Sequence, residues 1–174
     1  SIIDGKAFAA GLRARVADYA ASFEQAAGRK AGLAVVLVGE DPASKVYVKN
    51  KHASTIEVGM NSFEHRLDAS TSEADLLALI GKLNADPAVH GILVQLPLPE
   101  RLESHTPQLI RAIDPKKDVD GLTPSSLGAL VAHQQVVASC TPAGIMEILK
   151  FNKLNVGRKN VLVIGRSLIV GMPL

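Results

Sequence analysis

Apolar residues recur along this chain with the periods of both helices and strands. Residues 6–27 carry apolar side chains at steps of three and four, which predicts an amphipathic helix. Continuous apolar runs at Leu33–Val38 and Gly91–Leu96 predict strands that are buried on both faces, as in a parallel sheet. The run Ser62–Leu67 predicts a further, less apolar strand.

Capping and turn residues place helices between these strands. We expect one helix with Ser44 as its N-cap, running to about Val58 and stopped by Gly59. Ser72 and Asp75 resemble a capping box and predict the start of a second helix. The remaining predicted helices begin with Thr106 and Pro107, cover Ser125–Ala132, and cover Thr141–Phe151 with Thr141 as the cap.

The alternation of strands and helices predicts an α/β fold. Parallel strands joined by crossover helices form a three-layer N-terminal domain, since helices cover both faces of such a sheet. The apolar run Asn160–Ile164 predicts one more strand, and the glycine-bounded turn after it leads into a helix. These features indicate the start of a Rossmann-type domain. Because the new unit begins near Ser139, we expect one domain over residues 1–138 and an incomplete one over residues 139–174.

Composition narrows the classes of function. Hydrophobic residues make up 47% of the chain, which is enough for a sizeable core, but aromatic residues make up only 3%. The net charge of +2 and the scarcity of aromatic side chains argue against a nucleic-acid-binding protein. No apolar run reaches the ~20 residues of a membrane helix, and no signal peptide is visible. We therefore expect a protein of the cytoplasm.

Cys140 is the single cysteine, so no disulfide can form within the chain. This usage is typical of a reducing compartment. The thiol is either reactive or, as base rates favour, a small buried apolar residue.

Tyr47 and Lys51 lie four residues apart on one predicted helix, so their side chains emerge on one face. The Tyr47 ring could stack on a flat ligand while a partly desolvated Lys51 ammonium moves protons near neutral pH. Alternatively, Tyr47 packs while Lys51 and Lys49 merely solvate the helix. Gln95 ends a buried strand just before Pro97, where ligands bind in open α/β sheets. Its amide could equally satisfy local backbone groups.

The acidic loop that contains Asp118 and Asp120 does not match a calcium loop, because Lys116 occupies the position of an oxygen ligand. The five histidines show no metal-ligand spacing, so we expect no metal site. Asp118 or Asp120 could instead hold amine and amide donors of a ligand, or end a turn.

The run Val161–Gly171 places a strand before a glycine-bounded turn, as in dinucleotide-binding folds. Its spacing departs from the G-x-G-x-x-G fingerprint. Arg166 beside the turn would suit a 2′-phosphate and therefore favours NADP over NAD.

The order of these motifs resembles that of the bifunctional methylenetetrahydrofolate dehydrogenase/methenyltetrahydrofolate cyclohydrolase family. The resemblance spans the whole chain, and the motifs that carry it are Ile2–Lys6, Val38–Gly39 with Pro42–Ser44, Tyr47–Lys51, Gly91–Pro99, Lys117–Gly121, Cys140–Gly144 and Gly165–Pro173. It implies two α/β domains with a folate cleft between them, and a homodimer formed through the nucleotide domains. Members of this family continue for about another domain beyond this length.

The resemblance also implies roles for individual residues. Tyr47 would stack along the folate rings, Lys51 would transfer the proton in the cyclohydrolase step, and Gln95 would tune Lys51. Ser44 would support Lys51, and Asp120 would anchor the pterin. The other implied folate-binding residues are Val48, Val94 and Leu96, and the implied NADP-binding residues are Gly165, Arg166 and Ser167.

Two alternatives differ from this interpretation. Short-chain dehydrogenases also use Tyr-x-x-x-Lys, but their glycine turn precedes the Tyr, whereas Gly165 follows Tyr47 here. A non-catalytic folate-binding module would also keep Lys51 and Gln95, and an activity assay distinguishes it from the enzyme.

Overall fold

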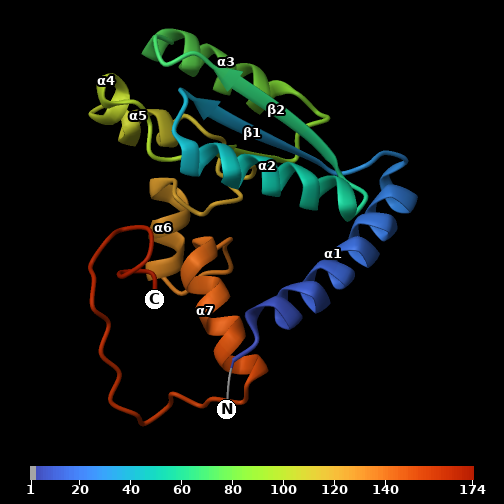
Figure 1. The fold of residues 1–174 in the computed structure, drawn as a ribbon, viewed down its shortest axis with the longest axis vertical. Helices are drawn as coiled ribbons and strands as arrows, with labels where there is room; N and C mark the ends of the chain where they lie inside the picture. The colour runs from blue at the N-terminus through green and yellow to red at the C-terminus, as the bar shows by residue number, and fades with distance from the viewer. Residues whose placement is uncertain (1–2) are drawn as a thin grey trace. The chain divides into compact units, whose positions relative to one another are not determined.

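The computed structural model describes residues 3–174, so Ile2 of the first family motif lies outside the described part. Two compact units make up the chain (Figure 1). One unit is Arg13–Val119, and the other consists of the described residues up to Leu12 together with Asp120–Leu174. The first helix, α1 (Gly5–Ala27), contributes residues to both units and confirms the predicted N-terminal helix.

The first unit contains the predicted parallel sheet. Its strands β1 (Gly32–Val38), β2 (Asn61–Leu67) and β3 (Gly91–Val94) lie in the order β2-β1-β3. Both neighbours of β1 run parallel to it. Strand β3 ends two residues earlier than predicted: the N–H of Gln95 still donates to Val36 O at 2.8 Å, but Pro97 has no N–H with which to continue the ladder.

Helices cover both faces of this sheet and make the expected three layers. Figure 1 shows α2 (Pro42–Glu57) and α3 (Glu73–Ala85) on opposite sides of it. On the α2 side, buried side chains form one cluster: Val35, Leu37, Val48 and Leu93, with Leu33 and Val119 packed against it. On α3, the buried residues are Leu76, Ile80 and Leu83.

The predicted start of α3 is confirmed, with Ser72 as its N-cap. Ser72 Oγ accepts a hydrogen bond from the Asp75 N–H at 3.1 Å and donates to Asp75 Oδ2 at 2.6 Å. Gly59 follows α2 with a φ of +83°, a left-handed conformation that favours glycine, so the predicted stop is also confirmed.

Two short helices follow β3. The sequence did not predict α4 (Glu100–Glu103), whose first turn follows Pro99. Helix α5 (Thr106–Arg111) begins at Thr106, one residue before the Pro107 predicted as its first helical residue. After α5 the chain returns to the open edge of β3, where Asp118 forms an isolated parallel bridge with Ile92. Gly91 permits this approach, because a Cβ there would lie 2.5 Å from Val119 Cγ1.

Lys117, in the segment that returns to β3, forms hydrogen bonds with the C-terminal end of α3. Its Nζ donates to the carbonyl oxygens of Leu83 at 3.1 Å and Asp86 at 2.7 Å. Its own carbonyl accepts a hydrogen bond from the Ile92 N–H at 2.7 Å. The side chain therefore satisfies carbonyls at a helix C-terminus while the backbone extends the edge of the sheet.

The second unit contains α6 (Pro124–Val131) and α7 (Cys140–Phe151). Thr123 caps α6 through the Ser126 N–H at 3.2 Å. The predicted N-cap Thr141 is wrong: Ser139 holds the N-cap position, and Pro142 therefore stands third in α7. Cys140 and Thr141 are helical, so α7 starts two residues before Pro142. Proline is tolerated there because the N–H groups of the first turn have no partner within the helix.

The predicted strand Asn160–Ile164 is also wrong. Residues 160–167 form neither helix nor strand, and 168–173 form turns in place of the predicted helix. Leu162 and Ile164 are 84% and 93% exposed. A strand needs a neighbour to bond its backbone, and no described strand pairs with this segment.

Within residues 3–174, no helix combines the length and the apolar character required to cross a membrane.

We predict that Lys117→Ala lowers the free energy of unfolding by about 1–2 kcal/mol, because two carbonyls lose a charged donor. The adjacent Lys116 is exposed and provides a control of equal charge, so Lys116→Ala should change stability little. Urea denaturation of both variants measures the difference, and equal losses would contradict the role of Lys117.

Candidate active site

Helix α2 carries four of the predicted site residues. Ser44 and Val48 are buried at 3% and 0% exposure and face the sheet. Lys51 is half-buried, and Tyr47 is 66% exposed. The half of the alternative in which Tyr47 packs is therefore wrong: Tyr47 presents an accessible ring, and the half-buried Lys51 follows it by four residues on the same helix.

Asp41, and not Ser44, is the N-cap of α2. Asp41 Oδ1 accepts a hydrogen bond from the Ser44 N–H at 2.7 Å, and Pro42 is the first helical residue. The hydrogen bonds from Ser44 lower the pKa of the Asp41 carboxyl below its ordinary value of 3.8. An acidic residue directly before a proline was the sequence signal for this cap. Ser44 is one turn further in and is held by the cap.

The end of β3 carries three more predicted residues. Val94 is 2% exposed, while Gln95 and Leu96 follow the strand and are half-buried. Gln95 Nε2 donates to Leu96 O at 2.7 Å, so its amide does satisfy a local backbone group. Leu93 of β3 and Val48 of α2 share one buried cluster, which ties the helix and the strand end into one body.

The two acidic candidates of the loop lie in different surroundings. Asp118 is 3% exposed, and its backbone bridges to β3, so it is part of the packed first unit. Asp120 is half-buried in the second unit, where it accepts a weak hydrogen bond from Cys140 Sγ at 3.6 Å. Among residues 3–174, no group of three or more His, Cys, Asp or Glu side chains could hold a metal ion.

Cys140 is exposed, so its interpretation as a small buried apolar residue is wrong. Cys140 lies in the first turn of α7, and Pro142 is the only residue of that helix that is fully buried. The exposure of Cys140 follows from this position.

The predicted cofactor residues lie in the exposed segment after α7. Gly165 has a φ of +144°, and a Cβ on Gly171 would lie 2.4 Å from Gly165 O, so both positions require glycine. Ser167 Oγ accepts hydrogen bonds from the N–H groups of Val170 at 3.2 Å and Gly171 at 3.3 Å. The segment is thus a tight glycine turn with a side-chain cap.

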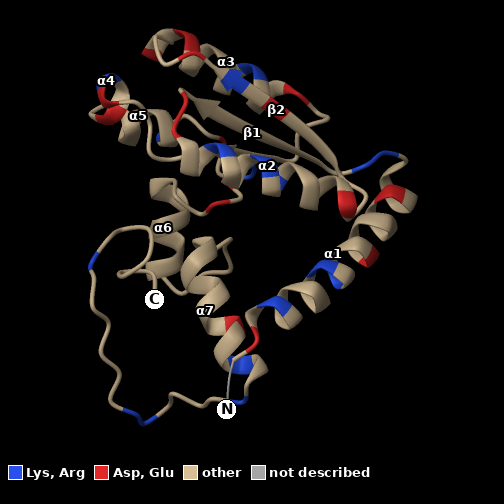
Figure 2. Cartoon of the chain, viewed as in Figure 1, with Lys and Arg blue, Asp and Glu red and all other residues tan. Residues whose placement is uncertain are grey.

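This segment is also basic. Residues 152–174 contain four Lys or Arg residues and no Asp or Glu, and Figure 2 marks the positions of Lys and Arg in blue along the trace that follows α7. By contrast, α1 and α7 each carry residues of both signs, whereas α6 carries no charged residue. A basic glycine turn is suited to an anionic ligand such as a phosphate.

Two family models match the chain. Residues 3–120 match the catalytic domain of tetrahydrofolate dehydrogenase/cyclohydrolase, and residues 139–174 match the NAD(P)-binding domain of the same family.

Bacterial relatives match the chain over its whole length. It is 55% identical to the bifunctional protein FolD 2 of Roseobacter denitrificans over 174 residues, which are 100% of this chain and 57% of the relative. It is 58% identical to the bifunctional protein FolD of Cereibacter sphaeroides over 172 residues, covering 99% of this chain and 57% of that protein. The chain therefore spans somewhat more than half the length of these relatives.

Solved structures of enzymes from the same family have a similar fold. The bifunctional FolD enzyme of Campylobacter jejuni has a TM-score of 0.93 at 39% identity, covering 99% of this chain and 61% of that one. The dehydrogenase-cyclohydrolase of Trypanosoma brucei, solved with NADP and an inhibitor, has a TM-score of 0.94 at 31% identity and covers 99% and 59%.

We predict that Asp41→Ala lowers the thermal midpoint at neutral pH and that its difference from wild type shrinks in acid. A carboxyl whose folded-state pKa is lowered contributes stability above the unfolded-state value of 3.8, and this contribution is lost as the pH falls through the folded-state pKa. Thermal unfolding followed by circular dichroism from neutral to acid pH measures it. A difference that stays constant across that range would contradict the charged-cap role.

Proposed function

Because this chain belongs to the tetrahydrofolate dehydrogenase/cyclohydrolase family, we propose that it oxidises 5,10-methylenetetrahydrofolate with NADP and hydrolyses the product to 10-formyltetrahydrofolate. The observation that carries this proposal is the exposed Tyr47 and half-buried Lys51 on α2, which packs on the same core as the end of β3. This arrangement lies wholly within the region matched by the catalytic-domain model.

The two proposed steps make different demands on the protein. In the first, a hydride leaves the methylene carbon for NADP, which requires two rings to be held together but no proton-transfer group. In the second, water adds to the methenyl carbon, a carbon–nitrogen bond of the ring opens, and one proton is released. The second step therefore needs a group that moves protons at neutral pH, and we assign that role to Lys51.

The other α2 and β3 residues support Lys51. Tyr47 would stack on the folate rings, which its exposure allows. The Gln95 amide would hydrogen-bond to Lys51 or to the substrate after its present hydrogen bond to the Leu96 carbonyl oxygen breaks. Ser44 would support Lys51 through the first turn of the helix. The buried Val48 and Val94 would form the floor beneath the folate, and the half-buried Leu96 would contact it.

Asp120 would anchor the amino and amide groups of the pterin. The different burial of the two loop carboxylates supports the choice, since Asp118 is packed against β3 whereas Asp120 is half-buried. A carboxylate suits this role, because it accepts hydrogen bonds from several donors at once.

Gly165, Arg166 and Ser167 would hold NADP, which when bound supplies the hydride acceptor. The residues fit this group: Gly165 adopts a φ of +144°, the backbone of Gly171 packs closely against that of Gly165, and Arg166 is exposed beside this tight turn. The Trypanosoma brucei structure was solved with NADP, which supports the same cofactor here.

We further propose that residues 1–138 form the folate domain and residues 139–174 the beginning of the nucleotide domain. The limits of the two family models, at residues 120 and 139, support this division. A homodimer formed through the nucleotide domains and a location in the cytoplasm complete the proposal. The single, exposed cysteine is consistent with a reducing compartment.

Lys51→Ala should abolish methenyltetrahydrofolate hydrolysis in the intact protein while leaving the circular dichroism spectrum unchanged. Lys51→Arg should also fail, because a guanidinium does not give up its proton near neutral pH. The exposed Lys49 on the same helix provides the control, and Lys49→Ala should retain activity. Near-normal hydrolysis by Lys51→Ala would overturn the assignment.

Asp120→Ala should raise the dissociation constant for folate in both activities by an amount that corresponds to about 1.5–3 kcal/mol, the value of a hydrogen bond to a charged group. Calorimetric titration with the folate substrate measures the change. Asp118→Ala should mainly lower thermal stability, since Asp118 is buried. Weaker folate binding in the Asp118 variant alone would show that Asp118 is the anchor.

A further inference from the structure

The face of the sheet beneath α2 changes character between its central and edge strands. The parallel register sets three apolar residues of β1 directly beside three polar residues of β2: Leu33 beside Ser62, Val35 beside Glu64 and Leu37 beside Arg66. The apolar residues pack with Val48 of α2 in the buried cluster. Where α2 overlies β2, the helix therefore meets hydrogen-bonding side chains in place of apolar ones.

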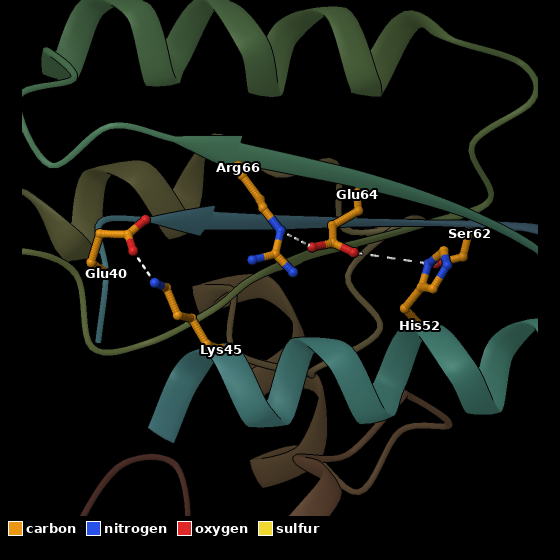
Figure 3. Close-up of polar contacts among 6 residues, drawn as sticks. All are labelled: Glu40, Lys45, His52, Ser62, Glu64 and Arg66. Atoms are coloured by element: carbon orange, nitrogen blue, oxygen red, sulfur yellow. Dashed lines mark hydrogen bonds and ion pairs between the residues drawn. The ribbon is translucent and has the colours of Figure 1, made fainter. Parts of the chain in front are cut away.

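Ser62, Glu64 and Arg66 form a polar strip on β2, and His52 of α2 contacts this strip (Figure 3). Its Nδ1 lies 2.8 Å from Ser62 Oγ, within hydrogen-bond distance, and 4.0 Å from Glu64 Oε2. Arg66 Nε contacts the other carboxylate oxygen of Glu64. The Glu64 side chain is only 19% exposed and contacts both Arg66 and the imidazole.

His52 directly follows Lys51, and this adjacency links the contact to the site. Consecutive residues of an α-helix point about 100° apart around the axis. Fixing His52 against β2 therefore fixes the roll of α2 and the direction in which Lys51 leaves it. Side chains reach about 5–6 Å from a helix axis, so a roll of about 10° moves the end of one by about 1 Å.

We propose that His52 is a positioning residue for Lys51 and that its hydrogen bond to Ser62 sets the roll of α2. The proposal rests on the assignment of Lys51 to the cyclohydrolase step. The His52 side chain is 44% exposed and Ser62 is half-buried, so a single hydrogen bond between them contributes little to overall stability. A displacement of about 1 Å at a reacting group nevertheless costs up to about 100-fold in rate. Its consequence is therefore kinetic.

The test compares the two activities in the intact protein. His52→Ala and Ser62→Ala should each lower the kcat of methenyltetrahydrofolate hydrolysis about 10- to 100-fold. The KM for folate and the kcat of the dehydrogenase should change less than about twofold, because hydride transfer does not use Lys51. The double variant should be no slower than either single variant, since both remove the same hydrogen bond.

Two further variants separate positioning from a general effect on the fold. His52→Asn places an amide near the position of Nδ1 and should recover most of the hydrolysis. Lys45 lies on α2 and forms an ion pair with Glu40 in the loop before the helix. Lys45→Ala removes this pair and should leave both activities unchanged.

Equal losses of both activities in His52→Ala, or no loss in Ser62→Ala, would overturn the proposal. Its failure is distinct from failure of the proposed function, which would appear as absent hydrolysis in the wild-type protein or as active Lys51→Ala.

Discussion

The burial of β1 on both faces and along both edges is the constraint on which the first unit depends. Five of its seven residues, from Ala34 to Val38, are at most 3% exposed, and each edge is bonded to a parallel neighbour. A strand in this position must be apolar throughout, and it needs a helix above and another below. This requirement accounts for the positions of α2 and α3 on the two faces of the sheet. It also brings α2 against β3, because Val48 of α2 and Leu93 of β3 pack in the same buried cluster as β1.

The site uses this rigid body in two ways. Residues that face the core, such as Val48, fix the height of α2 over the sheet, while residues at its flanks fix the rotation of the helix. Apolar packing is tolerant of small rotations, whereas a hydrogen bond between defined atoms is directional. A polar contact at the border of an apolar face therefore adds an angular restraint that the core does not supply.

Local signals in the sequence predicted the features whose partners are near in the chain. Ser72 and Asp75 are three residues apart, and Ser72 caps α3 through the Asp75 N–H. Asp41 was overlooked because Asp41 and Ser44 are both good caps three residues apart, and pattern alone does not choose between them. Asn160–Ile164 has the composition of a strand, but strand formation also depends on a partner elsewhere. The family motifs identified Lys51 and Tyr47, whereas His52 belongs to no such motif and meets Ser62 only after α2 has folded onto β2.

The charged residues of β2 have a second consequence, for the behaviour of the protein in solution. Strand β2 lies at the border of the described sheet, so one side of its backbone has no neighbouring strand among residues 3–174. An open border of this kind is a template on which another polypeptide could add a strand and begin aggregation. Arg66 raises the desolvation cost of such pairing, since its side chain is 53% exposed and a second strand would have to dehydrate its charge. The Arg66 side chain thus also protects the sheet against self-association.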